Sequence, residues 1–159
     1  MRFAVDIPAD FEGTGAAGAT LAGGRPASLW FLPPNGETLV ARALDLRDSY
    51  GQGTVSLVVP DMFWPELGNI LWKAVRVGRI PREPADKAVQ AMSEFRLPTI
   101  TSLGLLREAF SIAITFQCTV YDAVYVALAV LSGRTLVTAD ERLANTLAAH
   151  FPVRWLGAI

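Results

Sequence analysis

Short apolar runs that fit β-strands alternate with longer segments of helical period along most of this chain. The clearest strand lies at Val55 to Val59, a run rich in valine and leucine that is typical of a buried parallel strand. The clearest helix is Met62 to Val77, with Asp61 as its expected N-cap residue. Its apolar stripe has the spacing of an amphipathic helix and comprises Phe63, Leu67, Ile70, Leu71 and Ala74. This alternation predicts an α/β domain of three layers, with a central parallel sheet flanked by helices.

The same reading predicts the other elements. Further strands are expected at Arg2 to Asp6, Thr99 to Thr101, Thr135 to Thr138 and Val153 to Leu156. Further helices are expected at Ser28 to Leu32, Glu37 to Ser49, Pro84 to Phe95, Leu103 to Phe116, Thr119 to Ser132 with Gly133 closing it, and Glu141 to His150. We expect residues 1–159 to form one domain, with a Gly- and Ala-rich insertion at about 9–28.

The charge balance limits which partners the chain can bind. Fourteen basic against fifteen acidic side chains give a formal charge of −1, which excludes the broad positive field of an autonomous nucleic-acid binder. A polyanion would therefore need a local basic patch. Lys73, Arg76 and Arg79 offer one on a single helix, although a solvated basic helix end is the simpler explanation of them.

The lengths of the uncharged runs and the numbers of cysteines and histidines limit the expected compartment and chemistry of the chain. No uncharged run, Ala123 to Gly133 included, reaches the roughly 20 residues that span a bilayer, and the start resembles no signal peptide, so we expect a cytoplasmic protein. The single Cys118 excludes an internal disulfide, and its apolar neighbours argue against a thiol enzyme. The single His150 argues against a zinc site, which usually has several His or Cys ligands. Surplus apolar surface points to an oligomer or partner interface.

Four acids are the candidates for chemistry. Asp6 ends the first strand, Glu66 lies in the second turn of the helix that follows the Val55 strand, and Asp140 follows another strand by two residues. In a parallel sheet these positions share the edge where ligands bind. Asp122 lies on a helix that is apolar on every side, where an unpaired charge is costly. Asp122 and Asp140 also fit capping boxes, so a purely structural role stays open for both.

Carboxylates gathered at one place repel one another unless they hold protons or bind a cation. A cluster of oxygen ligands without His or Cys suits Mg²⁺ or Mn²⁺. Such an ion activates water and stabilises the charge that develops on a phosphodiester. The pattern therefore predicts a hydrolytic nuclease.

Three segments carry a resemblance to a known family. They are Leu57-Val-Val-Pro-Asp61 with the following Phe63 to Lys73, then Thr119-Val-Tyr-Asp122-Ala-Val-Tyr125, and Leu136-Val-Thr-Ala-Asp140-Glu-Arg-Leu143. In order and separation they resemble the PIN domain family, and specifically the VapC-type ribonuclease toxins of prokaryotic toxin–antitoxin pairs.

The resemblance implies a function and a set of site residues. Glu66, Asp122 and Asp140 match the second, third and fourth site acids, and Thr138 matches a hydroxyl position often found before the last of them. The family implies a Mg²⁺- or Mn²⁺-dependent endoribonuclease, a cognate antitoxin that covers the site, and a homodimer.

The first site acid departs from the family pattern. Val5-Asp6 matches a strand and its acid, but Ile7-Pro8 replaces the usual small and hydroxyl residues. We assign Asp6, with Asp10 as the alternative. The departure keeps a second hypothesis open: a catalytically impaired binding module that pairs with an antitoxin or with itself.

Another motif in the same region is weaker. Gly13-Thr-Gly15-Ala-Ala-Gly18 matches the dinucleotide-binding fingerprint in form, but it does not directly follow its strand. We interpret it as part of the glycine-rich insertion.

Overall fold

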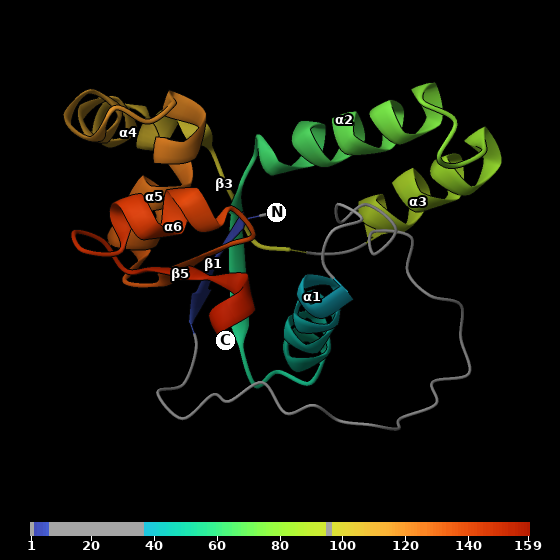
Figure 1. Cartoon of the computed structure of the whole chain (residues 1–159), viewed down its shortest axis with the longest axis horizontal. Helices are drawn as coiled ribbons and strands as arrows, with labels where there is room; N and C mark the ends of the chain where they lie inside the picture. The colour runs from blue at the N-terminus through green and yellow to red at the C-terminus, as the bar shows by residue number, and fades with distance from the viewer. Residues whose placement is uncertain (1, 7–36, 95–96) are drawn as a thin grey trace.

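The computed structural model describes residues 2–6, 37–94 and 97–159, and these build a five-stranded sheet in the order β3-β2-β1-β4-β5 (Figure 1). The strands are β1 (Arg2–Asp6), β2 (Ser56–Pro60), β3 (Thr99–Ile100), β4 (Thr135–Thr138) and β5 (Val153–Trp155). The predicted Ser28 to Leu32 helix, the insertion at about 9–28 and Asp10 lie outside the described residues.

The direction of β1 differs from the predicted parallel sheet. The outer pairs β2–β3 and β4–β5 are parallel, but β1 runs antiparallel to both β2 and β4. The register pairs Arg2 with Thr138, the last residue of β4, and Asp6 with Ser56, the first residue of β2. The prediction failed because apolar alternation reveals the faces of a strand but not its direction.

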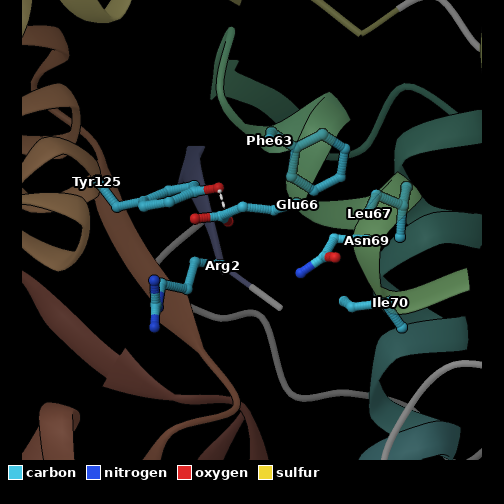
Figure 2. A pocket seen from close by; sticks show the side chains of 7 residues that line it. All are labelled: Arg2, Phe63, Glu66, Leu67, Asn69, Ile70 and Tyr125. Atoms are coloured by element: carbon cyan, nitrogen blue, oxygen red, sulfur yellow. Dashed lines mark hydrogen bonds between the residues drawn. The ribbon is translucent and has the colours of Figure 1, made fainter. Parts of the chain in front are cut away.

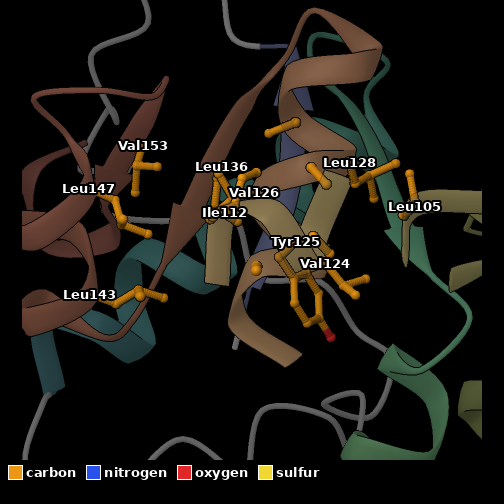
Figure 3. Packing of buried hydrophobic residues seen from close by; sticks show 14 of the residues in the cluster. Leu105, Ile112, Val124, Tyr125, Val126, Leu128, Leu136, Leu143, Leu147 and Val153 are labelled. Carbon is orange, nitrogen blue, oxygen red and sulfur yellow. The ribbon is translucent and has the colours of Figure 1, made fainter. Parts of the chain in front are cut away.

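Helices cover both faces of the sheet, which confirms the three-layer α/β architecture. They are α1 (Glu37–Gly51), α2 (Phe63–Arg76), α3 (Arg82–Glu94), α4 (Ser102–Phe116), α5 (Val120–Ser132) and α6 (Glu141–Leu147), followed by a short 3₁₀ turn, η2 (Leu156–Ala158). One core lies between the sheet and α4, α5 and α6 (Figure 3), and the other between the sheet and α1, the start of α2 and η2.

Alternation along the strands assigns side chains to these two cores. In β2, Val58 packs toward α5, while Leu57 and Val59 pack toward α1. In β4, Leu136 packs toward α5 and Val137 toward α1. Both strands are therefore apolar on both faces, as a central strand between two helix layers requires.

Most predicted elements agree with the observed bounds to within two residues, except that α6 ends at Leu147 rather than His150. The prediction for α5 is confirmed in detail: Thr119 accepts a hydrogen bond from the backbone N–H of Asp122, and Gly133 closes the helix at a left-handed φ of 65°.

The start of α2 differs from the prediction. Met62, not Asp61, is the N-cap residue, and its side chain makes no capping bond. Asp61 instead accepts hydrogen bonds from the hydroxyl and the backbone N–H of Ser102, which tie the end of β2 to the start of α4. The hydrogen bond from the Ser102 hydroxyl is the main reason that the pKa of Asp61 lies below its usual value.

Two glycines provide a test of these helix conformations. An alanine Cβ at Gly68, inside α2, would meet nothing within 4 Å, so Gly68→Ala is expected to stabilise the fold by about 0.5–1 kcal/mol. Gly133→Ala is expected to destabilise it by about 1 kcal/mol, because the φ of 65° strains a residue with a Cβ. Urea denaturation measures both free energies of unfolding. Equal effects from the two changes would contradict the assigned helix end.

Among the described residues, no single helix has the length and apolar character needed to cross a membrane. The pair α4 and α5 passes the same criteria only when taken together, and it is bent by 117°.

Candidate active site

The candidate site lies at the edge of the sheet where β2 and β4 end. The helix α2 follows β2 and carries Glu66, while the loop after β4 carries Asp140. The start of α5, which carries Asp122, packs on the same part of the sheet. The antiparallel β1 brings Arg2 to this edge.

Glu66 is held by a tyrosine from α5. The Tyr125 hydroxyl donates a hydrogen bond of 2.6 Å to Oε2 of Glu66, and the two side chains point toward each other in Figure 2. Tyr125 is only 1% exposed. Burial raises the pKa of Tyr125 well above its usual value, and the hydrogen bond to Glu66 raises this pKa further. The phenol therefore keeps its proton and acts as a donor that orients the carboxylate.

Asp122 contacts a cation and a hydroxyl. Its Oδ1 lies 2.6 Å from Nη2 of Arg2, and the Thr119 hydroxyl donates a hydrogen bond of 2.7 Å to its Oδ2. The Asp122 side chain is 18% exposed and that of Arg2 is 23% exposed. Thr119 caps the helix as predicted, because its hydroxyl accepts a hydrogen bond from the backbone N–H of Asp122, but the Asp122 carboxylate contacts this hydroxyl rather than completing the capping box. The charge on this apolar helix is paired by Arg2, which the sequence analysis did not single out.

Asp140 is the more exposed of the acids and caps α6. Its Oδ1 accepts a hydrogen bond of 3.0 Å from the backbone N–H of Leu143. The hydroxyl of Thr138, a fully buried residue, accepts a hydrogen bond of 3.0 Å from the backbone N–H of Asp140. The structural role that sequence analysis left open for Asp140 is thus present, and it fixes the carboxylate at the end of β4.

The structure does not bring Asp6 to this edge. Because Asp6 pairs with Ser56 at the start of β2, its backbone lies four residues from Arg2, about 13 Å along an extended strand. The prediction that Asp6 joins Glu66, Asp122 and Asp140 depended on a parallel β1, and the observed strand direction contradicts it.

Arg2 is the site residue that sequence analysis missed. One signal was available: an aspartate on an apolar helix requires a partner, and Arg2 is the charged residue at the other end of the strand that contains Asp6. With β1 antiparallel, the edge gains a cation beside Asp122 rather than a fourth carboxylate, which lowers the mutual repulsion of the acids.

A cavity of about 290 Å³ opens beside Glu66. Figure 2 shows the side chains that line it: Arg2, Phe63, Glu66, Leu67, Asn69, Ile70 and Tyr125. Ile70, predicted to lie on the buried stripe of α2, is 38% exposed and faces this cavity instead. The cavity therefore combines one carboxylate, one guanidinium and an apolar wall on α2.

The donor set suits a hard divalent ion in kind, because Glu66, Asp122 and Asp140 supply only oxygen ligands. A cation already lies among them, since the guanidinium of Arg2 contacts Asp122 and lies 5.5 Å from the centre of the Tyr125 ring. As the side chains are arranged, no three Asp, Glu, His or Cys groups in the described part of the chain converge on one ion position. Binding an ion by all three acids therefore requires their side chains to rearrange.

The exposed side of α2 continues from the cavity into basic residues. Lys73 comes two helical turns after Glu66, about 20° around the helix and about 10 Å along it. Arg76 lies over the ring of Trp72, 4.9 Å from its centre, and Trp72 is 54% exposed. Lys73 and Arg76 of the predicted basic patch are thus solvent-exposed on α2, whereas Arg79, which was predicted on the same helix, lies beyond its end.

Cys118 lies near the site but is poorly suited to nucleophilic chemistry. Burial raises the pKa of its thiol, and the carboxylate of Asp122 raises it further. Because the thiolate is the reactive form, alkylation of Cys118 by iodoacetamide at pH 8.5 is expected to be several-fold slower in the folded chain than in guanidinium chloride. Mass spectrometry of the alkylated protein measures both rates. Equal rates would contradict the described environment of this thiol.

The fold and the site together define a three-layer α/β domain in which β2 and β4 end at the same edge of the sheet, and the segments after these two strands carry Glu66 and Asp140. The model of the PIN domain family matches residues 27–147. This is more than half of the chain, and the chain belongs to that family.

Two similar proteins come from Pyrobaculum aerophilum. Ribonuclease VapC3 is 37% identical over 86 residues, which cover 53% of this chain and 66% of that protein. Exonuclease VapC9 is also 37% identical over 86 residues, which cover 53% of this chain and 62% of that protein. The match thus spans less than two thirds of either relative.

Proposed function

We propose that this chain is a metal-dependent ribonuclease, the toxin of a toxin–antitoxin pair, which hydrolyses phosphodiester bonds of RNA. One observation carries the proposal: Glu66, Asp122 and Asp140, which are distant in sequence, belong to one edge of the sheet, where Glu66 lines a cavity together with Arg2, the ion-pair partner of Asp122. The membership in the PIN domain family and the names of the two relatives support it.

In this proposal Glu66, Asp122 and Asp140 hold Mg²⁺ or Mn²⁺. The bound ion supplies an activated water and stabilises the negative charge that develops on the phosphodiester. The chain itself orients the acids: Tyr125 holds Glu66, Thr119 holds Asp122, and the first turn of α6 holds Asp140. Held carboxylates lose less conformational entropy when they bind an ion.

A nuclease assay tests the proposal directly. The purified chain is incubated with a mixed single-stranded RNA, and the products are separated on a denaturing gel. Cleavage is expected with Mn²⁺ or Mg²⁺ and is expected to stop when EDTA is added. A folded chain that leaves RNA intact with either ion would contradict the proposal.

The basic side of α2 is suited to hold the RNA backbone. Lys73→Ala is expected to weaken RNA binding and to lower the slope of log K against log salt by about 0.7, the value for one phosphate contact on a single strand. Fluorescence anisotropy at several salt concentrations measures the slope. The control Lys87→Ala removes an exposed lysine of α3 that pairs with Glu83, and it is expected to leave the slope unchanged. Equal slopes for Lys73→Ala and the unaltered chain would exclude Lys73 as a phosphate contact.

A second candidate function is a binding module without catalysis. One observation favours it: the sheet edge receives Arg2 where the resemblance places the first site acid, and β1 carries Asp6 to the opposite edge. A module of this kind would bind its protein partner tightly while showing no metal-dependent cleavage, so the nuclease assay separates the two functions.

Protein partners are the remaining part of the proposal. On α4, Leu103, Phe110 and Ile114 are all more than half exposed, and their spacing places them within about 40° on one side of the helix. Exposed apolar side chains in such a row mark surfaces that bind protein. They support a homodimer or an antitoxin contact, and sedimentation velocity of the chain with and without its antitoxin distinguishes the two.

A further inference from the structure

Arg2 is the basic residue that lies inside the acidic site. Its Nη2 contacts Oδ1 of Asp122 at 2.6 Å, and its guanidinium lies 5.5 Å from the centre of the Tyr125 ring. Arg2 also lines the cavity together with Glu66 (Figure 2). The side chain is only 23% exposed, so this contact differs from the ion pairs of α3, whose side chains are 66–85% exposed.

The sheet itself holds Arg2 at this position. The residue belongs to β1 and pairs with Thr138 of β4, two residues before Asp140. The backbone of Arg2 is therefore fixed beside the acids, while its long side chain retains the freedom to leave Asp122. The contact with the Tyr125 ring gives the guanidinium a second favourable interaction at the same place.

Arg2 offsets part of the negative charge at this edge of the sheet, and it therefore affects how tightly the acids bind a cation. Glu66, Asp122 and Asp140 bring three carboxylates, and Arg2 compensates one of them. An ion that takes Oδ1 of Asp122 as a ligand must break the charge-assisted bond of this oxygen to Arg2, while Oδ2 already accepts the hydrogen bond from the Thr119 hydroxyl. It must also accept a positive charge as a near neighbour.

We propose that Arg2 is a built-in counter-ion of the site, which pairs Asp122 in the metal-free chain and which a divalent ion displaces from it. Arg2 thereby weakens metal binding and keeps the acids paired until the ion arrives. The inference rests on the proposed function to the extent that it requires a divalent ion to bind Asp122.

The test measures metal affinity without using activity. Mn²⁺ is titrated into the metal-free chain, and the free ion is followed by its electron paramagnetic resonance signal. Arg2→Gln is expected to bind Mn²⁺ about tenfold more tightly than the unaltered chain, since a hydrogen bond between charged groups no longer has to be broken. Arg2→Lys, which keeps the charge, is expected to remain close to the unaltered chain.

A matched control separates this effect from the general change in charge. Arg82→Gln also removes one positive charge, but from an arginine of α3 whose side chain is 85% exposed. It is expected to leave Mn²⁺ affinity unchanged. Circular dichroism checks that each variant is folded. If Arg2→Gln does not fold, its Mn²⁺ affinity is not used, and that of Arg2→Lys is compared with the affinity of the unaltered chain.

The outcomes distinguish the inference from the proposed function. If the unaltered chain binds Mn²⁺ and Arg2→Gln binds it no more tightly, Arg2 is not a displaced counter-ion, while the metal-dependent function stands. If Arg82→Gln raises the affinity as much as Arg2→Gln does, the effect belongs to net charge and the inference is wrong. If neither the unaltered chain nor Arg2→Gln binds Mn²⁺, both the inference and the metal-dependent function are overturned.

Discussion

Replacing Asp122 by asparagine is expected to lower metal-dependent RNA cleavage about 100- to 1,000-fold, the usual loss when one electrostatic contact to a reacting group is removed. Asparagine has nearly the same shape and can still accept the hydrogen bond that the Thr119 hydroxyl donates to Asp122. The change therefore removes the charge while it preserves the start of α5. Initial rates of cleavage of a fluorescently labelled RNA at saturating Mn²⁺ measure the loss.

The control for this change is Glu141→Gln. Glu141 directly follows Asp140 and is exposed in the first turn of α6, so this variant also removes a negative charge close to the site. It is expected to cleave RNA at nearly the rate of the unaltered chain. Asp122 does not act in catalysis if Asp122→Asn, shown by its melting temperature to be folded, loses less than about tenfold.

The parts of the site that sequence analysis predicted well depend on local chemistry. The helix from Thr119 to Gly133 follows from a capping threonine, an apolar run and a terminal glycine, each of which acts within a few residues. Asp122 stands out because that helix is apolar on every side. Glu66 and Asp140 were assigned to one edge because each follows a strand, and β2 and β4 do end at the same edge of the sheet.

The part that failed depends on a long-range choice. Either direction of β1 gives the same apolar alternation, so the pattern cannot decide whether Asp6 or Arg2 reaches the acidic edge. The structure joins Arg2 to Asp122, and a contact between residues so far apart has no local signature. An argument from charge would have favoured Arg2, because a cation among three carboxylates is more stable than a fourth carboxylate.

The same limit applies to Asp61. A residue that precedes a helix and carries a short polar side chain is an ordinary N-cap candidate. Its carboxylate instead accepts hydrogen bonds from Ser102, which belongs to another helix. The local sequence therefore identified Asp61 as a carboxylate that needs hydrogen-bond donors. The donors belong to Ser102, at the start of α4, and not to the first turn of α2.

Leu136→Ala is expected to lower the free energy of unfolding by about 2–5 kcal/mol, a large share of the 5–15 kcal/mol typical of a domain. Leu136 is fully buried in β4, within the core between the sheet and α5 and α6 (Figure 3). Truncation removes apolar contacts and leaves a space that the surrounding strands cannot readily close. Each kcal/mol lost is expected to lower the melting temperature by about 2–4 °C, which calorimetry measures.

The matched control makes the same chemical change on the surface. Leu103 lies on α4 with 78% of its area exposed, so Leu103→Ala is expected to alter the stability of the isolated chain by less than about 0.5 kcal/mol. A large loss in this control at high protein concentration, but not on dilution, would show that a second copy covers α4. A small loss in Leu136→Ala would instead contradict the packing of β4 against α5, the helix that carries both Asp122 and Tyr125.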